Sequence, residues 1–261
     1  MSIQACAELV QRGDPDRFLA TMAAPVAARA RLFPLYAFNL EVARAPWLTQ
    51  EAMIAEMRLQ WWRDALEEIG QGGPVRRHEV VTPLADLLEP QDAARLDALV
   101  EARRWDIYRD PFDDRAAFEA HIEATAEHLM WTAARLLGAD RGEAVLRDFA
   151  HAVGVANWLQ AIPELEARGR VPLVDGRPEA VAALAQDALG RLRRARAKRA
   201  ELVAARAGVP GLGDELRVAQ QAIAPDGRQQ RVFAVDPLVA DTRDLFGKAL
   251  DQLVVDGVQF D

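Results

Sequence analysis

The chain has 261 residues, of which 51% are hydrophobic and 28% are charged. This apolar content is ample for a buried core and excludes a disordered or fibrous chain. The net charge of −8 argues against a nucleic-acid partner, because neutralising phosphates requires a positive surface. Cys6 is the single cysteine, so we expect no disulfide framework, no cysteine metal cluster and a reducing compartment.

The first 17 residues include Glu8, Asp14 and Asp16 and lack the basic start and apolar run that are typical of a signal peptide. No stretch reaches the roughly 18 consecutive apolar residues that a membrane-spanning helix requires. We therefore predict a cytoplasmic protein, and we leave a peripheral contact with a membrane open.

Apolar residues recur at helical spacing along nearly the whole chain, which predicts an all-α fold. Asp14 and Thr49 are expected to cap helices, and Pro34 is expected to kink one. The breaks are short, which favours one domain over residues 1–261. The expected helices cover residues 3–12, a segment from 15, residues 25–44, 49–69, a short segment from 82, and residues 91–108, 115–137, 142–162, 178–206, 214–223 and 237–255.

Three segments stand out by their composition, order and spacing. They are Asp16-Arg17-Phe18 with Pro25, Arg29 and Leu35-Tyr36-Ala37-Phe38; residues 56–66 with Gly73-Pro74 and His78; and Ala167-Arg168-Gly169-Arg170-Val171. Together they resemble the squalene/phytoene synthase family over roughly residues 16–175. The tail after residue 208 is divergent.

This resemblance implies an isoprenoid-synthase-like bundle of antiparallel helices around a central cavity. Active members of the family join two prenyl diphosphates with Mg²⁺, which takes oxygen ligands from carboxylates and phosphates. They carry two aspartate-rich motifs on facing helices, where carboxylates four residues apart share one face.

The first of these motifs departs from the family pattern. Ala43, Arg44 and Trp47 occupy the positions at which the resemblance places aspartates. Glu41 is the remaining carboxylate, about half a turn away. We therefore predict no metal ligands in this segment.

The second motif, between residues 154 and 168, also departs from the pattern. Pro163 is expected to end the helix where the aspartates would point inward, and Glu164 and Glu166 diverge because they are two residues apart. His121 and Glu127 stand where the family often has a tyrosine and a glycine. A buried Glu127 would be costly without a partner.

Residues 36–41, 60–62 and 161–168 resemble the non-catalytic branch of the family that contains a mitochondrial complex I assembly factor. The resemblance implies a pseudoenzyme without catalytic residues or cofactor, whose partner is a complex I subunit or assembly intermediate. Two alternatives stay open: an active prenyltransferase that uses Mg²⁺ and displaced carboxylates, and a carrier with an isoprenoid or lipid in its cavity.

The candidate residues for lining the cavity or binding a partner come from the matching segments. They are Arg29, Tyr36, Phe38, Asn39, Glu41, Arg58, Gln60, Trp61, Trp62, Arg168 and Arg170.

Other patterns have plainer interpretations. Asp106, Asp110 and Asp114 are expected to cap a helix and not to bind a metal. His121, His128 and His151 lack the spacing of a metal site, so we expect them to be satisfied or exposed. The arginine-rich residues 191–199 predict a solvated helix with scattered ion pairs, with an anionic lipid or partner surface as the alternative.

Overall fold

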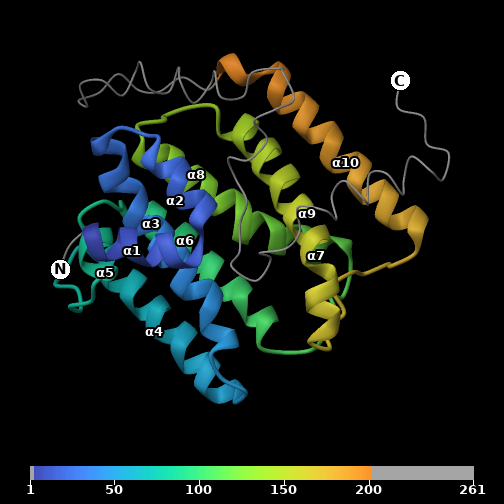
Figure 1. The fold of residues 1–261 in the computed structure, drawn as a ribbon, viewed down its shortest axis with the longest axis horizontal. Coiled ribbons are helices and arrows are strands. Elements are labelled where there is room, and N and C mark those ends of the chain that lie inside the picture. Colours follow the sequence, from blue (N-terminus) through green and yellow to red (C-terminus); the bar gives the residue numbers. More distant parts are fainter. Residues whose placement is uncertain (1–2, 202–261) are drawn as a thin grey trace.

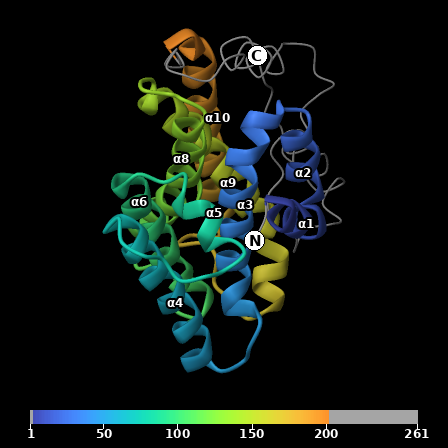
Figure 2. The same cartoon turned by 90° about the vertical axis from the view of Figure 1, so that its left-hand side faces the viewer.

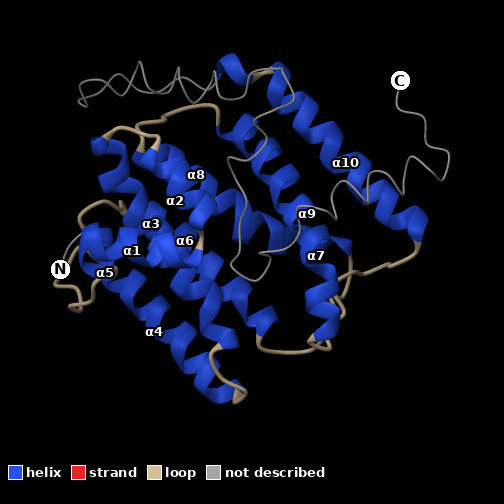
Figure 3. Ribbon diagram, viewed as in Figure 1, coloured by secondary structure: helices blue, strands red, loops and turns tan. Residues whose placement is uncertain are grey.

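The structure is a computed structural model that describes residues 3–201. Within this range the regular elements are all helical, which confirms the all-α prediction (Figures 1 and 3). The α-helices are α1 (Ile3–Gly13), α2 (Pro15–Met22), α3 (Val26–Arg44), α4 (Ala52–Gly70), α5 (Val81–Ala85), α6 (Pro90–Ala102), α7 (Arg115–Ile122), α8 (His128–Leu136), α9 (Glu143–Ala167) and α10 (Pro178–Ala197). Short turns of other helix types are η1 (Ala45–Trp47), η2 (Arg103–Asp106), η3 (Glu123–Glu127) and η4 (Arg199–Glu201). The helices predicted over 214–223 and 237–255 lie outside the described residues, as does the end of the predicted helix 178–206.

One of the two predicted caps is confirmed. Asp14 precedes α2, and its Oδ1 accepts a hydrogen bond from the backbone N–H of Arg17 at 2.9 Å. The cap at Thr49 is wrong, because α4 begins only at Ala52. Thr49 Oγ1 instead accepts from the backbone N–H of Glu51 at 3.1 Å and stabilises the turn before the helix.

The prediction that Pro163 ends its helix is wrong. Helix α9 continues through Pro163 to Ala167, because a proline removes only one backbone donor. Leu165 is buried beyond the proline, and the N–H of Arg168 bonds to the carbonyl of Glu164 at 3.1 Å. The helix then ends at Gly169, which has a φ of 74°.

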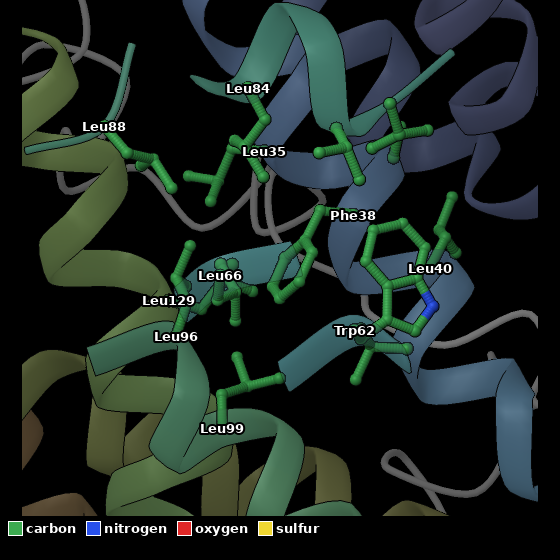
Figure 4. Close-up of a cluster of buried hydrophobic side chains, with 14 of the residues drawn as sticks. Leu35, Phe38, Leu40, Trp62, Leu66, Leu84, Leu88, Leu96, Leu99 and Leu129 are labelled. Atoms are coloured by element: carbon green, nitrogen blue, oxygen red, sulfur yellow. The ribbon is translucent and has the colours of Figure 1, made fainter. Parts of the chain in front are cut away.

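The larger hydrophobic core lies between α1, α3, α4, α5, α6 and α8 (Figure 4). Phe38 of α3 meets Trp62 of α4 edge-on, with ring centroids 5.4 Å apart. Trp62 is 5% exposed, whereas Trp61 is only partly buried. One of the two adjacent tryptophans is therefore deeper, as expected for side chains that point about 100° apart on a helix.

A second apolar cluster joins α7, α9 and α10 around Phe112, Phe118 and Trp158. Helix α10 packs along α9, and both lie on the right-hand side of the molecule in Figure 1. Ile122, Trp158 and Leu165 of this cluster also line a cavity inside the fold.

The helix predicted over 115–137 is interrupted by a π-helical turn, η3, between α7 and α8. Helix α9 approaches this turn at Gly154. A Cβ atom at Gly154 would lie 2.8 Å from Ala126 Cβ and 2.8 Å from Ile122 Cγ2. The absence of a side chain therefore allows α9 to contact the turn closely.

Candidate functional site

A cavity of about 140 Å³ lies between α3, α8, α9 and the π-helical turn, as predicted. Its apolar wall comes mainly from the turn, α8 and α9, which place aliphatic side chains and one indole toward it. These residues are Ile122, Ala126, Leu129, Met130, Val153, Trp158, Ala161 and Leu165. Polar side chains from α2, α3, η2, α7 and α9 complete the lining.

The α3 side of the cavity presents Tyr36 and Asn39. Asn39 is 2% exposed, and its Oδ1 has no hydrogen-bond partner among the described residues. The Arg17 guanidinium lies 4.8 Å from the Tyr36 ring centroid and forms a 3.3 Å ion pair with Asp14. Burial raises the pKa of Tyr36, so its hydroxyl stays protonated at neutral pH.

His121 lines the same cavity and is almost fully buried. Burial, assisted by the charge of Arg103, lowers the pKa of His121 to about 3. The imidazole is therefore neutral at physiological pH, and it offers the cavity a polar edge without a charge.

The buried Glu127 has partners, which offsets the expected cost of its burial. His151 Nδ1 lies 3.0 Å from Glu127 Oε1, and Arg147 Nε lies 3.9 Å from Oε2. His128 Nδ1 is 3.2 Å from the carbonyl oxygen of Arg95. The prediction of satisfied histidines is thus confirmed for His128 and for Nδ1 of His151. It is wrong for the Nε2 atoms of His121 and His151, which are buried without a hydrogen-bond partner among the described residues.

Asp106 and Glu164 are the carboxylates that line the cavity, and an arginine engages each of them. Arg103 Nη1 lies 3.4 Å from Asp106 Oδ2, and Arg168 Nε donates to Glu164 Oε1 at 2.6 Å. Residues 3–201 contain no cluster of three or more potential metal ligands of the His, Cys, Asp and Glu types. A Mg²⁺–diphosphate cluster needs free carboxylate oxygens, so this donor set does not fit it.

The positions at which the resemblance places the first motif hold no carboxylate. Ala43 is buried, Arg44 is exposed, and Trp47 lines the cavity with its ring. Glu41 is half-buried and is not among the residues that line the cavity.

Asp114 and the arginine-rich helix, whose patterns were given plainer interpretations, have structural roles. Asp114 Oδ1 accepts from the backbone N–H of Ala117 at 2.7 Å and caps α7, as expected. In the arginine-rich helix α10, Arg194 pairs with Asp148 at 3.0 Å and Arg191 pairs with Asp187 at 3.6 Å. These ion pairs agree with the prediction of a solvated helix.

Of the predicted candidates, Tyr36, Asn39 and Arg168 line the cavity, and Arg170 lines a second pocket that shares Trp47 and Arg168 with it. Arg168 and Arg170 place their guanidinium carbons 4.7 and 5.3 Å from the ring centroid of Trp47.

The other candidates lie away from the cavity. Phe38 and Trp62 belong to the core, and Trp61 stacks beneath Arg76 at 4.9 Å. Arg29 Nε donates to the carbonyl of Ala24 at 2.5 Å. Two more are exposed on α4, namely Arg58 and Gln60.

Sequence reasoning did not assign Arg17, Arg103 and His121 to the cavity. The sequence could have indicated Arg17, because this residue belongs to the first segment that resembles the family. Arg103 reaches the cavity from the turn η2, which the sequence predicted as part of a longer helix. His121 stands where the family often has a tyrosine, and it was expected to be satisfied or exposed.

The chain matches the model of the squalene/phytoene synthase family over residues 10–235, and it therefore belongs to this family. The structure is similar to a crystal structure of a dehydrosqualene synthase in complex with ligand, with a TM-score of 0.66 and 13% identity. That match covers 97% of this chain and 95% of the other. It confirms the isoprenoid-synthase-like fold.

Three curated relatives are complex I assembly proteins. The chain is 30% identical over 184 residues to "NADH dehydrogenase (ubiquinone) complex I, assembly factor 6 homolog" of Drosophila melanogaster, covering 65% of this chain and 53% of that protein. It is 27% identical over 178 residues to assembly factor 6 of Bos taurus and 24% over 170 residues to that of Homo sapiens, each match covering 64% of this chain and 51% of the relative. The chain thus spans about half the length of these relatives.

Among residues 3–201, no helix is both long enough and apolar enough to cross a membrane.

Proposed function

We propose that this chain is a non-catalytic member of the squalene/phytoene synthase family that supports the assembly of respiratory complex I. The observation that carries the proposal is its similarity to relatives named as complex I assembly factors. The partner would be a complex I subunit or an assembly intermediate.

The cavity chemistry supports the non-catalytic part of this proposal. Diphosphate leaves only when its charge is neutralised, and the family does this with Mg²⁺ held by carboxylates. Here Asp106 and Glu164 are paired with Arg103 and Arg168, and the first-motif position at Trp47 holds an indole. We therefore expect no catalytic residue and no cofactor.

Complementation of a deletion strain tests this proposal against the prenyltransferase alternative. The variant combines Glu41→Ala with Glu164→Gln, which removes the carboxylate nearest the first motif and the one at the second. An assembly protein should restore NADH:quinone oxidoreductase activity with this variant, with unaltered chain as the control. Restored prenyl products with the unaltered chain, lost with the variant, would contradict the proposal.

The apolar lining favours one second candidate, a carrier that holds an isoprenoid or lipid. Leu129, Met130 and Trp158 give the cavity a surface suited to a hydrocarbon chain, and Asn39 adds a buried polar atom. Organic extraction of the purified protein followed by mass spectrometry tests this candidate. A stoichiometric lipid would support the carrier, and lipid-free protein that still restores complex I would exclude it.

A further inference from the structure

A second pocket, of about 290 Å³, is lined by the segment that connects α3 to α4. This connection lies at the lower end of the molecule in Figures 1 and 2. One wall is the segment 46–55, and the other comes from residues 107–109 and 168–170. Three arginines line it, Arg109, Arg168 and Arg170, with Glu51 as the lining carboxylate. This local positive excess stands in a chain whose net charge is −8.

The structure fixes two of these arginines in place. Arg170 donates from Nη2 to the carbonyl of Asp106 at 2.5 Å and from Nη1 to the carbonyl of Tyr108. Arg168 is held by Glu164, and both guanidinium groups lie over the ring of Trp47. Their charges are therefore preorganised.

The third arginine completes a cluster of like charges. Arg109 is exposed. Gly169 stands between Arg168 and Arg170 in the sequence, and a Cβ atom at Gly169 would lie 3.9 Å from Arg109 Nη1. Burial lowers the pKa of Arg170, and while Asp106 raises it, the charges of Arg109 and Arg168 lower it further. An oxyanion in the pocket would relieve this repulsion, and guanidinium groups match phosphate oxygens in geometry.

Exposed apolar side chains lie on the segments that border the pocket. Met53 and Met57 are 76% and 66% exposed, and they share one face of α4 because they are four residues apart. Leu48 is exposed in the segment that forms the pocket wall. Tyr108 and Val171, also exposed, are each next in sequence to a pocket arginine.

The arginines together with the exposed apolar side chains indicate which kind of partner surface fits this end of the molecule. A soluble phosphate ester would account for the arginines but not for the exposed methionine, leucine and valine side chains on the same segments. The lipid–water interface offers phosphate groups beside hydrocarbon, and exposed apolar side chains next to cations are typical of proteins that bind it.

We propose that this end of the molecule docks on an anionic phospholipid surface, with a lipid phosphate in the pocket of Arg109, Arg168 and Arg170. Leu48, Met53 and Met57 enter the headgroup region around it. This inference goes beyond the proposed function and does not depend on it.

Co-sedimentation of the full chain with vesicles tests the docking surface. Vesicles of phosphatidylcholine alone are compared with vesicles that also contain phosphatidylglycerol, and we expect binding to the second kind. Arg109→Glu changes the charge at the surface by two, which predicts a loss of affinity on the order of 30-fold. Arg109 has an exposed side chain, so the variant should keep its melting temperature.

Matched controls separate the pocket from general charge and general hydrophobicity. Arg141→Glu makes the same charge change at an exposed site in the α8–α9 connection, at the opposite end of the molecule (Figures 1 and 2), and should bind normally. Met53→Asp with Met57→Asp should abolish vesicle binding, whereas Leu19→Asp on α2 should not.

Three results would overturn the proposal. Equal losses with Arg109→Glu and Arg141→Glu would show attraction by overall charge. Binding to pure phosphatidylcholine that Arg109→Glu leaves unchanged would remove the role of the pocket. Arg109-dependent binding of glycerol phosphate without vesicle binding would assign the pocket to a soluble ester.

Discussion

Replacing Gly154 with alanine tests how closely α9 approaches the π-helical turn. The added methyl group would lie 2.8 Å from both Ala126 Cβ and Ile122 Cγ2, well inside van der Waals contact. Ala126 has no rotamer that moves its Cβ away, and Ile122 is 1% exposed and closely packed. One of the two helices must therefore shift.

The magnitude follows from two opposing effects. Overpacking of this kind costs about 1–3 kcal/mol. Alanine in place of glycine inside a helix contributes about 1 kcal/mol in the other direction. We expect Gly154→Ala to lower the free energy of unfolding by up to about 2 kcal/mol, the balance of these two effects.

Gly190→Ala in α10 is the matched control. Its new Cβ would meet only the end of the Arg194 side chain, at 3.9 Å, so the helix-propensity gain remains without a clash. Both variants gain the same helix propensity, so this gain drops out when their free energies of unfolding, measured by urea denaturation, are compared. Gly154→Ala should then be less stable than Gly190→Ala by about 1–3 kcal/mol. Two variants of equal stability would refute the close approach of α9 to the turn.

Three further predictions concern the core and the cavity. Trp62→Ala should cost about 3–5 kcal/mol in urea denaturation and Trp61→Ala clearly less, and equal losses would contradict the depth assigned to Trp62. His121 has an ordinary pKa of 6.5 when unfolded and about 3 when folded, so the unfolded state binds more protons between these values and stability falls as the pH is lowered through them. His121→Gln should reduce this slope, and an unchanged slope would show that His121 is not buried in neutral form. Titration calorimetry with Mg²⁺ and a diphosphate analogue should show no saturable site, and coupled binding at micromolar concentration would contradict the mismatch of the donor set.

Local signals in the sequence predicted most helices of the described part. Asp14 with Pro15 located the start of α2, and the apolar spacing predicted a helix over 49–69 where the structure has α4. These features depend on residues within a turn or two of one another, which the sequence shows directly.

Features that depend on contacts across the fold were not predictable in this way. Pro163 lies inside α9 because packing of Leu165 outweighs the loss of one backbone hydrogen bond. The pairing of Glu127 with His151 depends on how α9 crosses the π-helical turn, 24 residues away in the chain.

The candidate site shows the same division. Tyr36, Asn39 and Arg168 were placed near the cavity by resemblance to the family. The ion pairs of Asp106 and Glu164 were not predicted, although each joins residues three or four apart in the chain. That these two carboxylates line the cavity depends on contacts across the fold, which the sequence does not show.

Deletion of the gene in its native host tests the central claim most directly. Assembled complex I is measured by native gel and NADH:quinone oxidoreductase activity, and squalene and carotenoid pools are measured in the same cells. The account predicts less assembled complex I, restored by the unaltered chain, with unchanged isoprenoid pools. Normal complex I together with the loss of an isoprenoid product would contradict it and identify the chain as a synthase.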